Sequence, residues 1–194
     1  MRRNSVRIIA GTWRRRLIHF PDAPDLRPTP DRVRETLFNW LGQDLTGKSC
    51  LDLFAGSGAL GFEAASRAAR RVLMVEREPM VLRALQESAK ALGIETVEFL
   101  RDDALQFLRR PRGRFDVVFL DPPYRSELLP QLLPLLPAHL NDNALVYAEH
   151  RGRLVLPENW HAIRRSRAGQ VNYLLIQYMQ DEQSPNNSGL PGNF

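Results

Sequence analysis

Short apolar runs alternate with stretches of helical periodicity over most of the chain. The apolar runs occupy residues 49–54, 71–76, 96–100, 115–120, 144–150 and 171–179. The helical stretches between them cover residues 59–69, 79–92, 104–109 and 127–136, and Pro130 and Pro134 make the last of these irregular. Strands that alternate with helices in this way predict an α/β fold, with a mostly parallel sheet covered by helices on both faces.

The last apolar run, residues 171–179, has no clear helix before it. A parallel strand needs a long crossover connection, whereas an antiparallel strand can follow a short turn. We therefore expect residues 171–179 to join the sheet antiparallel at one edge, with residues 160–166 as the candidate partner strand.

Residues 1–45 follow a different pattern and predict a small N-terminal extension, called the basic arm below. Residues 6–10 and 16–20 have the composition of a hairpin with a turn between them. A proline-rich connector then leads to a helix over residues 31–41, for which Thr29 is the predicted cap. The expected division is a basic arm at 1–45, a main domain at 46–180 and a disordered polar tail at 181–194.

Positive charge is concentrated in the basic arm. Residues 1–50 carry ten Lys and Arg against five Asp and Glu, whereas residues 51–194 carry 17 of each sign. Residues 1–16 alone hold six arginines and no acid. A cluster of this kind is typical of a nucleic-acid-binding protein, although a solvated basic tail has the same composition.

The composition argues against several other classes of protein. With one cysteine, the chain cannot form an intrachain disulfide. No apolar stretch reaches the roughly 18 residues of a membrane span, and the charged N-terminus lacks the apolar core of a signal peptide. The four histidines show no metal-ligand spacing. We therefore expect a cytoplasmic monomer with no metal and no membrane contact.

A glycine-rich loop follows the first strand of the main domain. The segment DLFAGSGALG, from Asp52 to Gly61, ends that strand and opens a helix. Gly56 and Gly58 allow a tight turn and the close approach of a ligand to the main chain. Glu76 ends the next strand, where its carboxylate can accept hydrogen bonds from the hydroxyls of a ribose. These features predict a site for an adenosyl group.

Two classes of cofactor fit such a site. GSGALG matches the G-x-G-x-x-G loop of nicotinamide enzymes. The lead-in D-x-F-x-G-x-G, which contains Asp52 and Phe54, resembles the first motif of methyltransferases that use S-adenosyl-L-methionine. In a methyltransferase, Asp103 would accept from the adenine amino group and the Ala104 N–H would face a ring nitrogen. Asp103 fits equally well as the cap of the following helix.

The strand over residues 115–120 delivers the tetrapeptide Asp121-Pro122-Pro123-Tyr124. The two prolines fix two φ angles and remove two backbone donors, so the turn is rigid and rich in acceptors. Asp121 and the Pro122 carbonyl can each accept one N–H of a base amino group, which turns the nitrogen lone pair toward a methyl donor. Tyr124 can stack on the base, and Asp121 can also take the departing proton as a general base.

These motifs resemble the D-P-P-[YF] amino-methyltransferases of nucleic acids. RIIAGTWRRR, LRPTPDRVRETLFNW, LDLFAGSGALGFEA and DPPY together resemble the ribosomal RNA small subunit methyltransferase D family, over about residues 6–178. The resemblance implies a seven-stranded Rossmann-like methyltransferase domain with an N-terminal extension. It also implies methyl transfer from S-adenosyl-L-methionine to N2 of one guanine in bacterial 16S rRNA, within an assembled or partly assembled 30S subunit.

The motifs, the charge of the basic arm and the resemblance together give candidate roles to particular positions of this chain. The catalytic candidates are Asp121, Pro122 and Tyr124. The candidates for cofactor binding are Asp52, Phe54, Gly56, Gly58, Glu76, Asp103 and Ala104. The candidates for RNA binding are Arg7, Arg14, Arg15, Arg16, Arg32 and Arg125, and Thr29 is placed near the cleft. The chain departs from the family pattern in having Arg15 for a common glycine and Asp103 for a common asparagine.

Three alternatives stay open at this point. A nicotinamide-dependent oxidoreductase accounts for the glycine loop and Glu76 but gives DPPY and the basic arm no role. A non-catalytic RNA-binding protein accounts for the arm but not for the intact motifs. A DNA adenine methyltransferase uses a similar tetrapeptide, so the chemistry alone does not exclude it.

Overall fold

The computed structural model describes residues 3–22, 26–110, 112–123 and 128–179. Within these residues the chain builds a seven-stranded sheet in the order β5-β4-β3-β6-β7-β9-β8, beside a separate two-stranded hairpin, β1-β2. Strands β3 to β7 pair in parallel, whereas β9 pairs antiparallel with both β7 and β8. The mostly parallel α/β fold expected from the sequence is confirmed, as is the antiparallel edge.

The elements follow the predicted runs closely. The strands of the main sheet are β3 (Ser49–Asp52), β4 (Arg71–Val75), β5 (Val97–Leu100), β6 (Phe115–Leu120), β7 (Leu140–His150), β8 (Trp160–Ala168) and β9 (Val171–Tyr178). The helices are α1 (Asp31–Trp40), α2 (Ala59–Ser66), α3 (Pro79–Leu92), α4 (Ala104–Leu108), α5 (Leu129–Leu132) and the 3-10 helix η1 (Leu136–His139). The hairpin consists of β1 (Arg3–Arg7) and β2 (Leu17–Pro21).

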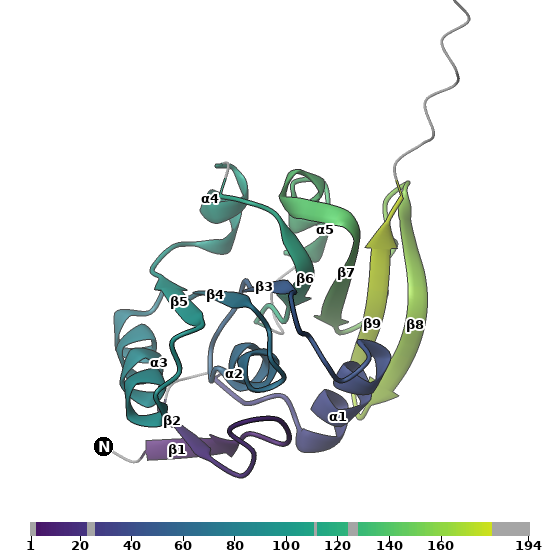
Figure 1. The fold of residues 1–194 in the computed structure, drawn as a ribbon. Coiled ribbons are helices and arrows are strands. Elements are labelled where there is room, and N and C mark those ends of the chain that lie inside the picture. Colours follow the sequence, from purple (N-terminus) through teal and green to yellow (C-terminus); the bar gives the residue numbers. More distant parts are fainter. Residues whose placement is uncertain (1–2, 23–25, 111, 124–127, 180–194) are drawn as a thin grey trace, which may run out of the picture.

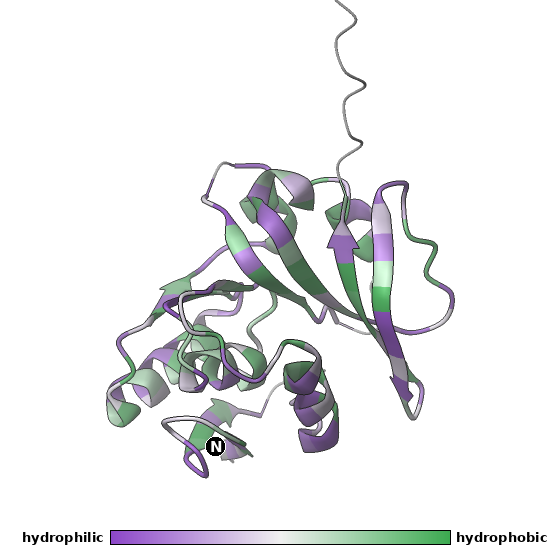
Figure 2. Cartoon of the chain, turned by 45° about the vertical axis from the view of Figure 1, so that its right-hand side comes forward, coloured by the Kyte–Doolittle hydropathy of each residue, from purple (hydrophilic) through white to green (hydrophobic). Residues whose placement is uncertain are grey.

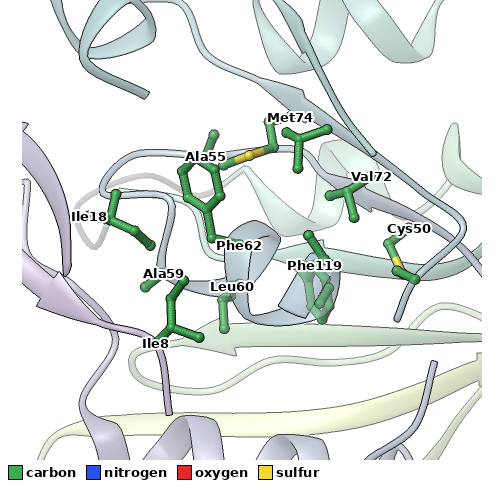
Figure 3. Packing of buried hydrophobic residues seen from close by; sticks show 14 of the residues in the cluster. Ile8, Ile18, Cys50, Ala55, Ala59, Leu60, Phe62, Val72, Met74 and Phe119 are labelled. Carbon is green, nitrogen blue, oxygen red and sulfur yellow. The ribbon is translucent and has the colours of Figure 1, made fainter. Parts of the chain in front are cut away.

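The sheet separates two layers of helices, as Figure 1 shows. Helices α1, α2 and α3 and the hairpin cover one face, and α4 and α5 cover the other. On the first face, Phe62 of α2 and Phe119 of β6 lie in one buried cluster with Ile8 and Ile18 of the basic arm (Figure 3). The arm therefore shares the hydrophobic core of the main domain.

The first strand of the hairpin is displaced from its predicted position. We expected residues 6–10, but β1 ends at Arg7 and pairs with β2 from Arg3↔Pro21 to Arg7↔Leu17. The backbone N–H groups of Ile9 and Ala10 instead donate to the Glu63 carboxylate, at 2.7 and 3.0 Å. A contact across more than fifty residues thus ends the strand, and local composition cannot reveal such a contact.

Glu63 is the centre of a buried ion network that joins the arm to α2. Its carboxylate also lies 3.4 Å from Arg34 Nη1 and 2.9 Å from Arg67 Nε. The Glu63 and Arg34 side chains are completely buried. Buried charges of this kind are tolerated only when they are paired and hydrogen-bonded, so the network orients the elements that carry it.

Three further expectations need correction. Thr29 does not cap α1, because its hydroxyl donates to Asp121 Oδ2 at 3.3 Å and Pro30 occupies the cap position. The stretch predicted over residues 127–136 divides into the short helix α5 and η1, in keeping with its prolines. Strand β7 begins at Leu140, four residues before the predicted run.

Candidate active site

A cleft opens at the carboxyl ends of the parallel strands, where β3 and β6 lie side by side. The chain leaves β3 toward β4 and β5 and then returns to β6, so the strand order reverses at this point. Open α/β sheets bind ligands at such a reversal because the connecting loops diverge there. The lining includes the glycine loop from Asp52 to Ser57, Glu76, Asp103, Asp121 and Pro122.

The glycine loop turns sharply into α2. Gly58 caps the helix with a φ of 79°, and a Cβ there would lie 2.7 Å from the Phe62 ring. A side chain at this position would be both strained and obstructed. The buried Asp52 carboxylate accepts the Gly61 N–H at 2.9 Å, and burial raises the pKa of Asp52 to about 7. Asp52 therefore holds the loop in place from the wall of the cleft.

Glu76 lies half-buried at the end of β4 and faces the same cleft. Its Oε2 accepts the Gly56 N–H at 2.9 Å and its Oε1 accepts the Glu78 N–H at 2.8 Å. Each carboxylate oxygen has a second lone pair, so both can still accept a hydroxyl. Hydrogen bonds from the main chain therefore fix the Glu76 carboxylate beside the glycine loop.

Asp103 and Ala104 lie where β5 passes into α4. The Asp103 side chain caps the helix, because its Oδ1 accepts the N–H groups of Leu105 and Gln106 at 3.0 and 3.2 Å. The capping role that was left open is thereby confirmed. Oδ2 makes no hydrogen bond to any described residue, and Asp103 lines the cleft together with Ala104. Asp103 can therefore cap α4 through Oδ1 and still contact a ligand through Oδ2.

Asp121 follows β6 and is surrounded by other acids. Its Oδ2 accepts the Thr29 hydroxyl at 3.3 Å, and the carboxyl of Glu149, near the end of β7, interacts with it electrostatically. Burial and the charges of Glu149 and Asp52 raise the pKa of Asp121 well above its ordinary value. Two neighbouring carboxyls repel each other when both are ionised, so the raised pKa of Asp121 favours a pair that holds one proton.

Sequence reasoning did not find Glu149. Its side chain is buried and accepts the Tyr147 hydroxyl at 2.7 Å, while burial raises its pKa. No cation in the described parts of the chain forms an ion pair with Asp52, Asp121 or Glu149. One signal was available: a glutamate near the end of an otherwise apolar parallel strand is expected to be buried, and a buried acid is a candidate for function.

The remaining catalytic candidates are only partly described. Pro122 is buried in the wall of the cleft beside Asp121. Tyr124 and Arg125 lie outside the described residues. Arg27, which the sequence analysis passed over, is exposed in the connector after β2 and lines the cleft.

The arginines proposed for RNA binding separate into two groups. Arg7 and Arg32 are exposed near the first turn of α1, and Arg7 forms an ion pair with Asp31. The exposed Arg14, Arg15 and Arg16 lie in the hairpin loop, which contacts the C-terminal ends of α2 and α3. In that loop Trp13 Nε1 donates to the carbonyl of Leu92, the last residue of α3, at 3.0 Å, whereas the first turn of α3 lines the cleft.

The described residues contain neither a membrane-spanning helix nor a cluster of metal ligands. No helix there is long and apolar enough to cross a bilayer. Within the same residues, no group of His, Cys, Asp and Glu has the arrangement of a metal site.

Comparison with known proteins identifies the chain's relatives. Residues 6–177 match the family model described as Conserved hypothetical protein 95. Ribosomal RNA small subunit methyltransferase D of Haemophilus influenzae is 43% identical over 183 residues, which cover 90% of this chain and 95% of the relative. The Escherichia coli K12 protein of the same name is 43% identical over 177 residues, 89% of each chain.

Solved structures agree with these matches. An Escherichia coli structure with a provisional assignment as a methyltransferase has a TM-score of 0.82 at 41% identity, over 90% of this chain and 98% of its own. A Streptococcus mutans structure solved with S-adenosylhomocysteine has a TM-score of 0.62 at 15% identity, over 75% of this chain and 48% of its own, and so supports the fold alone.

The fold and cleft define a Rossmann-like methyltransferase. Within that class, the chain belongs to the family of the ribosomal RNA small subunit methyltransferase D proteins, the Conserved hypothetical protein 95 family. The family resemblance noted in the sequence is thereby confirmed, and the protein is a methyltransferase of ribosomal RNA.

Proposed function

We propose that this protein transfers a methyl group from S-adenosyl-L-methionine to the exocyclic N2 of one guanine in 16S rRNA. The observation that carries the proposal is a single cleft lined by the glycine loop, Glu76 and the Asp121-Pro122 turn. An adenosyl cofactor and an amino group held in the same cleft have the proximity that methyl transfer requires. The names of the relatives support ribosomal RNA of the small subunit as the substrate.

The substrate that fits this proposal is 16S rRNA in an assembled or partly assembled 30S subunit. The enzyme acts as a monomer in the cytoplasm. Its cofactor occupies the half of the cleft formed by Phe54, Gly56, Glu76 and the Asp103-Ala104 step, and Gly58 supports the turn behind this half. S-adenosyl-L-methionine has no phosphates, so the glycine loop serves close approach of the ligand. Titration with S-adenosyl-L-methionine and with NADH tests this choice, and NADH binding with no binding of the methyl donor would exclude it.

Glu76→Ala is expected to weaken S-adenosyl-L-methionine binding by about 10- to 150-fold. The ribose hydroxyls lose a charged acceptor, a contact worth about 1.5–3 kcal/mol. Isothermal titration calorimetry measures the effect. Glu87→Ala is the matched control, because Glu87 is an exposed carboxylate on α3 that does not line the cleft. Unchanged affinity in Glu76→Ala would remove this residue from the cofactor site.

The chemistry at the other half of the cleft follows from its acceptors. Asp121 and the Pro122 carbonyl hold the two N–H bonds of the guanine amino group and direct its lone pair at the methyl carbon. The C–S bond breaks as the C–N bond forms, and the sulfur keeps the electron pair. The nitrogen then carries the positive charge that the sulfonium has lost. Release of one N–H proton to the protein restores neutral nitrogen.

The Asp121–Glu149 pair is the acceptor for that proton. In this proposal Asp121 carries the proton of the resting pair and donates it to the Glu149 carboxylate, which also accepts from Tyr147. The oxygen of Asp121 that carries no proton accepts the proton from nitrogen through its remaining lone pair, while Asp121 passes its own proton to Glu149. One N–H bond and one O–H bond break and two O–H bonds form, so the proton cancels the positive charge on nitrogen and the single negative charge of the pair.

Glu149→Gln is expected to lower the single-turnover rate about 100-fold and to change its dependence on pH. In the parent enzyme, Glu149 must be ionised to accept the proton, so the rate falls as pH drops through its pKa. Burial raises that pKa, which places the acid limb above the range of an ordinary glutamate. In the variant Asp121 acts without the charge of Glu149, so its pKa falls and the limb moves to lower pH. An unchanged pH–rate profile would contradict the role of Glu149.

Arg14→Glu, Arg15→Glu and Arg16→Glu together are expected to weaken RNA binding and flatten its dependence on salt. Each lost phosphate contact removes about 0.7–0.9 from the slope of log affinity against log salt. Charge reversal is a cleaner test than deletion of residues 1–16, because Ile8 lies in the core. RNA titrations at several salt concentrations measure the slope. An unchanged slope would show that the hairpin loop makes no phosphate contact.

A further inference from the structure

A second concentration of positive charge lies in the C-terminal part of the sheet. Residues 150–169 contain five arginines and one acid, Glu158. Charge totals over residues 51–194 conceal this segment, because acids elsewhere in the main domain balance it. Arg164, Arg165 and Arg167 belong to β8, the edge strand of the sheet. In Figure 2 the arrowhead end of this strand has the colour of hydrophilic residues.

The register of the strands places these arginines level with Asp121 along the strand direction. Leu120 pairs with Ala148, Ala148 with Leu174, and Leu174 with Arg165. Arg165 is therefore level with the last residue of β6, directly before Asp121. Arg167 lies two residues further, toward the carboxyl edge of the sheet. Three strand spacings separate β6 from β8, a distance of roughly 14 Å. A nucleotide held at Asp121 would have neighbouring phosphates within that distance.

The three side chains are available to a ligand. All are exposed, and none forms an ion pair with an acid of the described residues. Arg164 and Arg167 donate only to nearby carbonyls, those of Ile163 and Gly169. Charges on an edge strand also prevent pairing between sheets, but that role requires only exposed charge. It explains neither the single sign of the charge nor its position level with Asp121.

We propose that Arg164, Arg165 and Arg167, the β8 arginine surface, bind the phosphates of the RNA segment that flanks the target guanine. This inference rests on the proposed function and extends it to the path of the substrate. Guanidinium groups bind phosphate oxygens in a bidentate manner, and exposed arginines suit a polyanion. The hairpin loop cannot serve these phosphates, because it lies at the far end of α2 and α3 from the cleft.

The test compares two double variants that remove equal charge. Arg165→Gln with Arg167→Gln changes the β8 arginine surface. Arg70→Gln with Arg114→Gln changes two exposed arginines at the amino ends of β4 and β6, away from the cleft at the carboxyl ends of the strands. Binding to 30S subunits that lack the modification is measured at several potassium chloride concentrations. We expect the β8 variant to lose on the order of tenfold in affinity and about 1.4–1.8 of the salt slope.

Further measurements separate this inference from its alternatives. The charge-preserving variant Arg165→Lys with Arg167→Lys is expected to retain most of the affinity and the slope. Affinity for S-adenosyl-L-methionine and thermal stability should stay at the parent values. An unchanged slope in the β8 variant, or an equal loss in both double variants, would overturn the inference. Binding is measured without turnover, so a parent enzyme that binds subunits but methylates no guanine refutes the proposed function separately.

Discussion

Asp121→Ala is expected to lower the single-turnover rate of methyl transfer by about 10²–10⁴-fold, with the affinity for S-adenosyl-L-methionine nearly unchanged. The substitution removes an acceptor for the guanine amino group and the first acceptor of its proton. The adenosyl half of the cleft, formed by the glycine loop and Glu76, keeps its contacts. Rapid-quench assays with labelled cofactor measure the rate, and calorimetry measures the affinity.

Asp142→Ala is the matched control for this result. Asp142 is an exposed carboxylate near the start of β7, at the edge of the sheet opposite the cleft. Its removal should leave both rate and affinity at the parent values. Near-normal methylation by Asp121→Ala would contradict the orienting mechanism, whatever the behaviour of the control.

Glu63→Ala is expected to destabilise the protein by about 3–5 kcal/mol. The change leaves the buried Arg34 and Arg67 side chains without their carboxylate and removes the acceptor of the Ile9 and Ala10 N–H groups. Urea unfolding followed by circular dichroism measures the free energy of unfolding. A loss of this size is a large part of the stability of an ordinary domain.

A matched surface pair distinguishes this effect from a general loss of charge. Glu78→Ala removes an exposed carboxylate that lies 3.4 Å from Arg77. Exposed ion pairs contribute about 0–1 kcal/mol, so this variant should unfold almost as the parent does. A similarly small loss in Glu63→Ala would show that the ion network does not hold the arm.

The network also connects the basic arm to the reaction site. Arg34 Nε donates to the Thr29 carbonyl at 3.1 Å, and the Thr29 hydroxyl donates to Asp121. A continuous path of contacts therefore runs from Glu63 in α2 through Arg34 to Asp121. The arm contributes a positioning contact to the main domain as well as charge.

Much of the fold could be predicted because its signals are local. Continuous apolar runs give buried parallel strands, and the glycines after β3 and the prolines after β6 mark turns with unusual backbone demands. The glycine turn follows β3 and the proline turn follows β6, and the strand order reverses between these two neighbouring strands. The topology therefore brings both turns into one cleft.

The features that sequence reasoning missed depend on distant contacts. Local rules made Thr29 a helix cap, yet its hydroxyl bonds to Asp121, 92 residues away. The end of β1 is fixed by Glu63, and the interaction of Glu149 with Asp121 joins the ends of two neighbouring strands. The β8 arginine surface becomes visible only when the register shows which residues lie level with Asp121.

The central claim is tested most directly by identifying the methylated product. The protein is incubated with labelled S-adenosyl-L-methionine and 30S subunits from cells that lack the corresponding activity, and the rRNA is then digested and analysed by mass spectrometry. The account predicts N2-methylguanosine at one nucleotide of 16S rRNA, with no label in ribosomal proteins. Label in adenine, in protein or in no component of the subunit would contradict it.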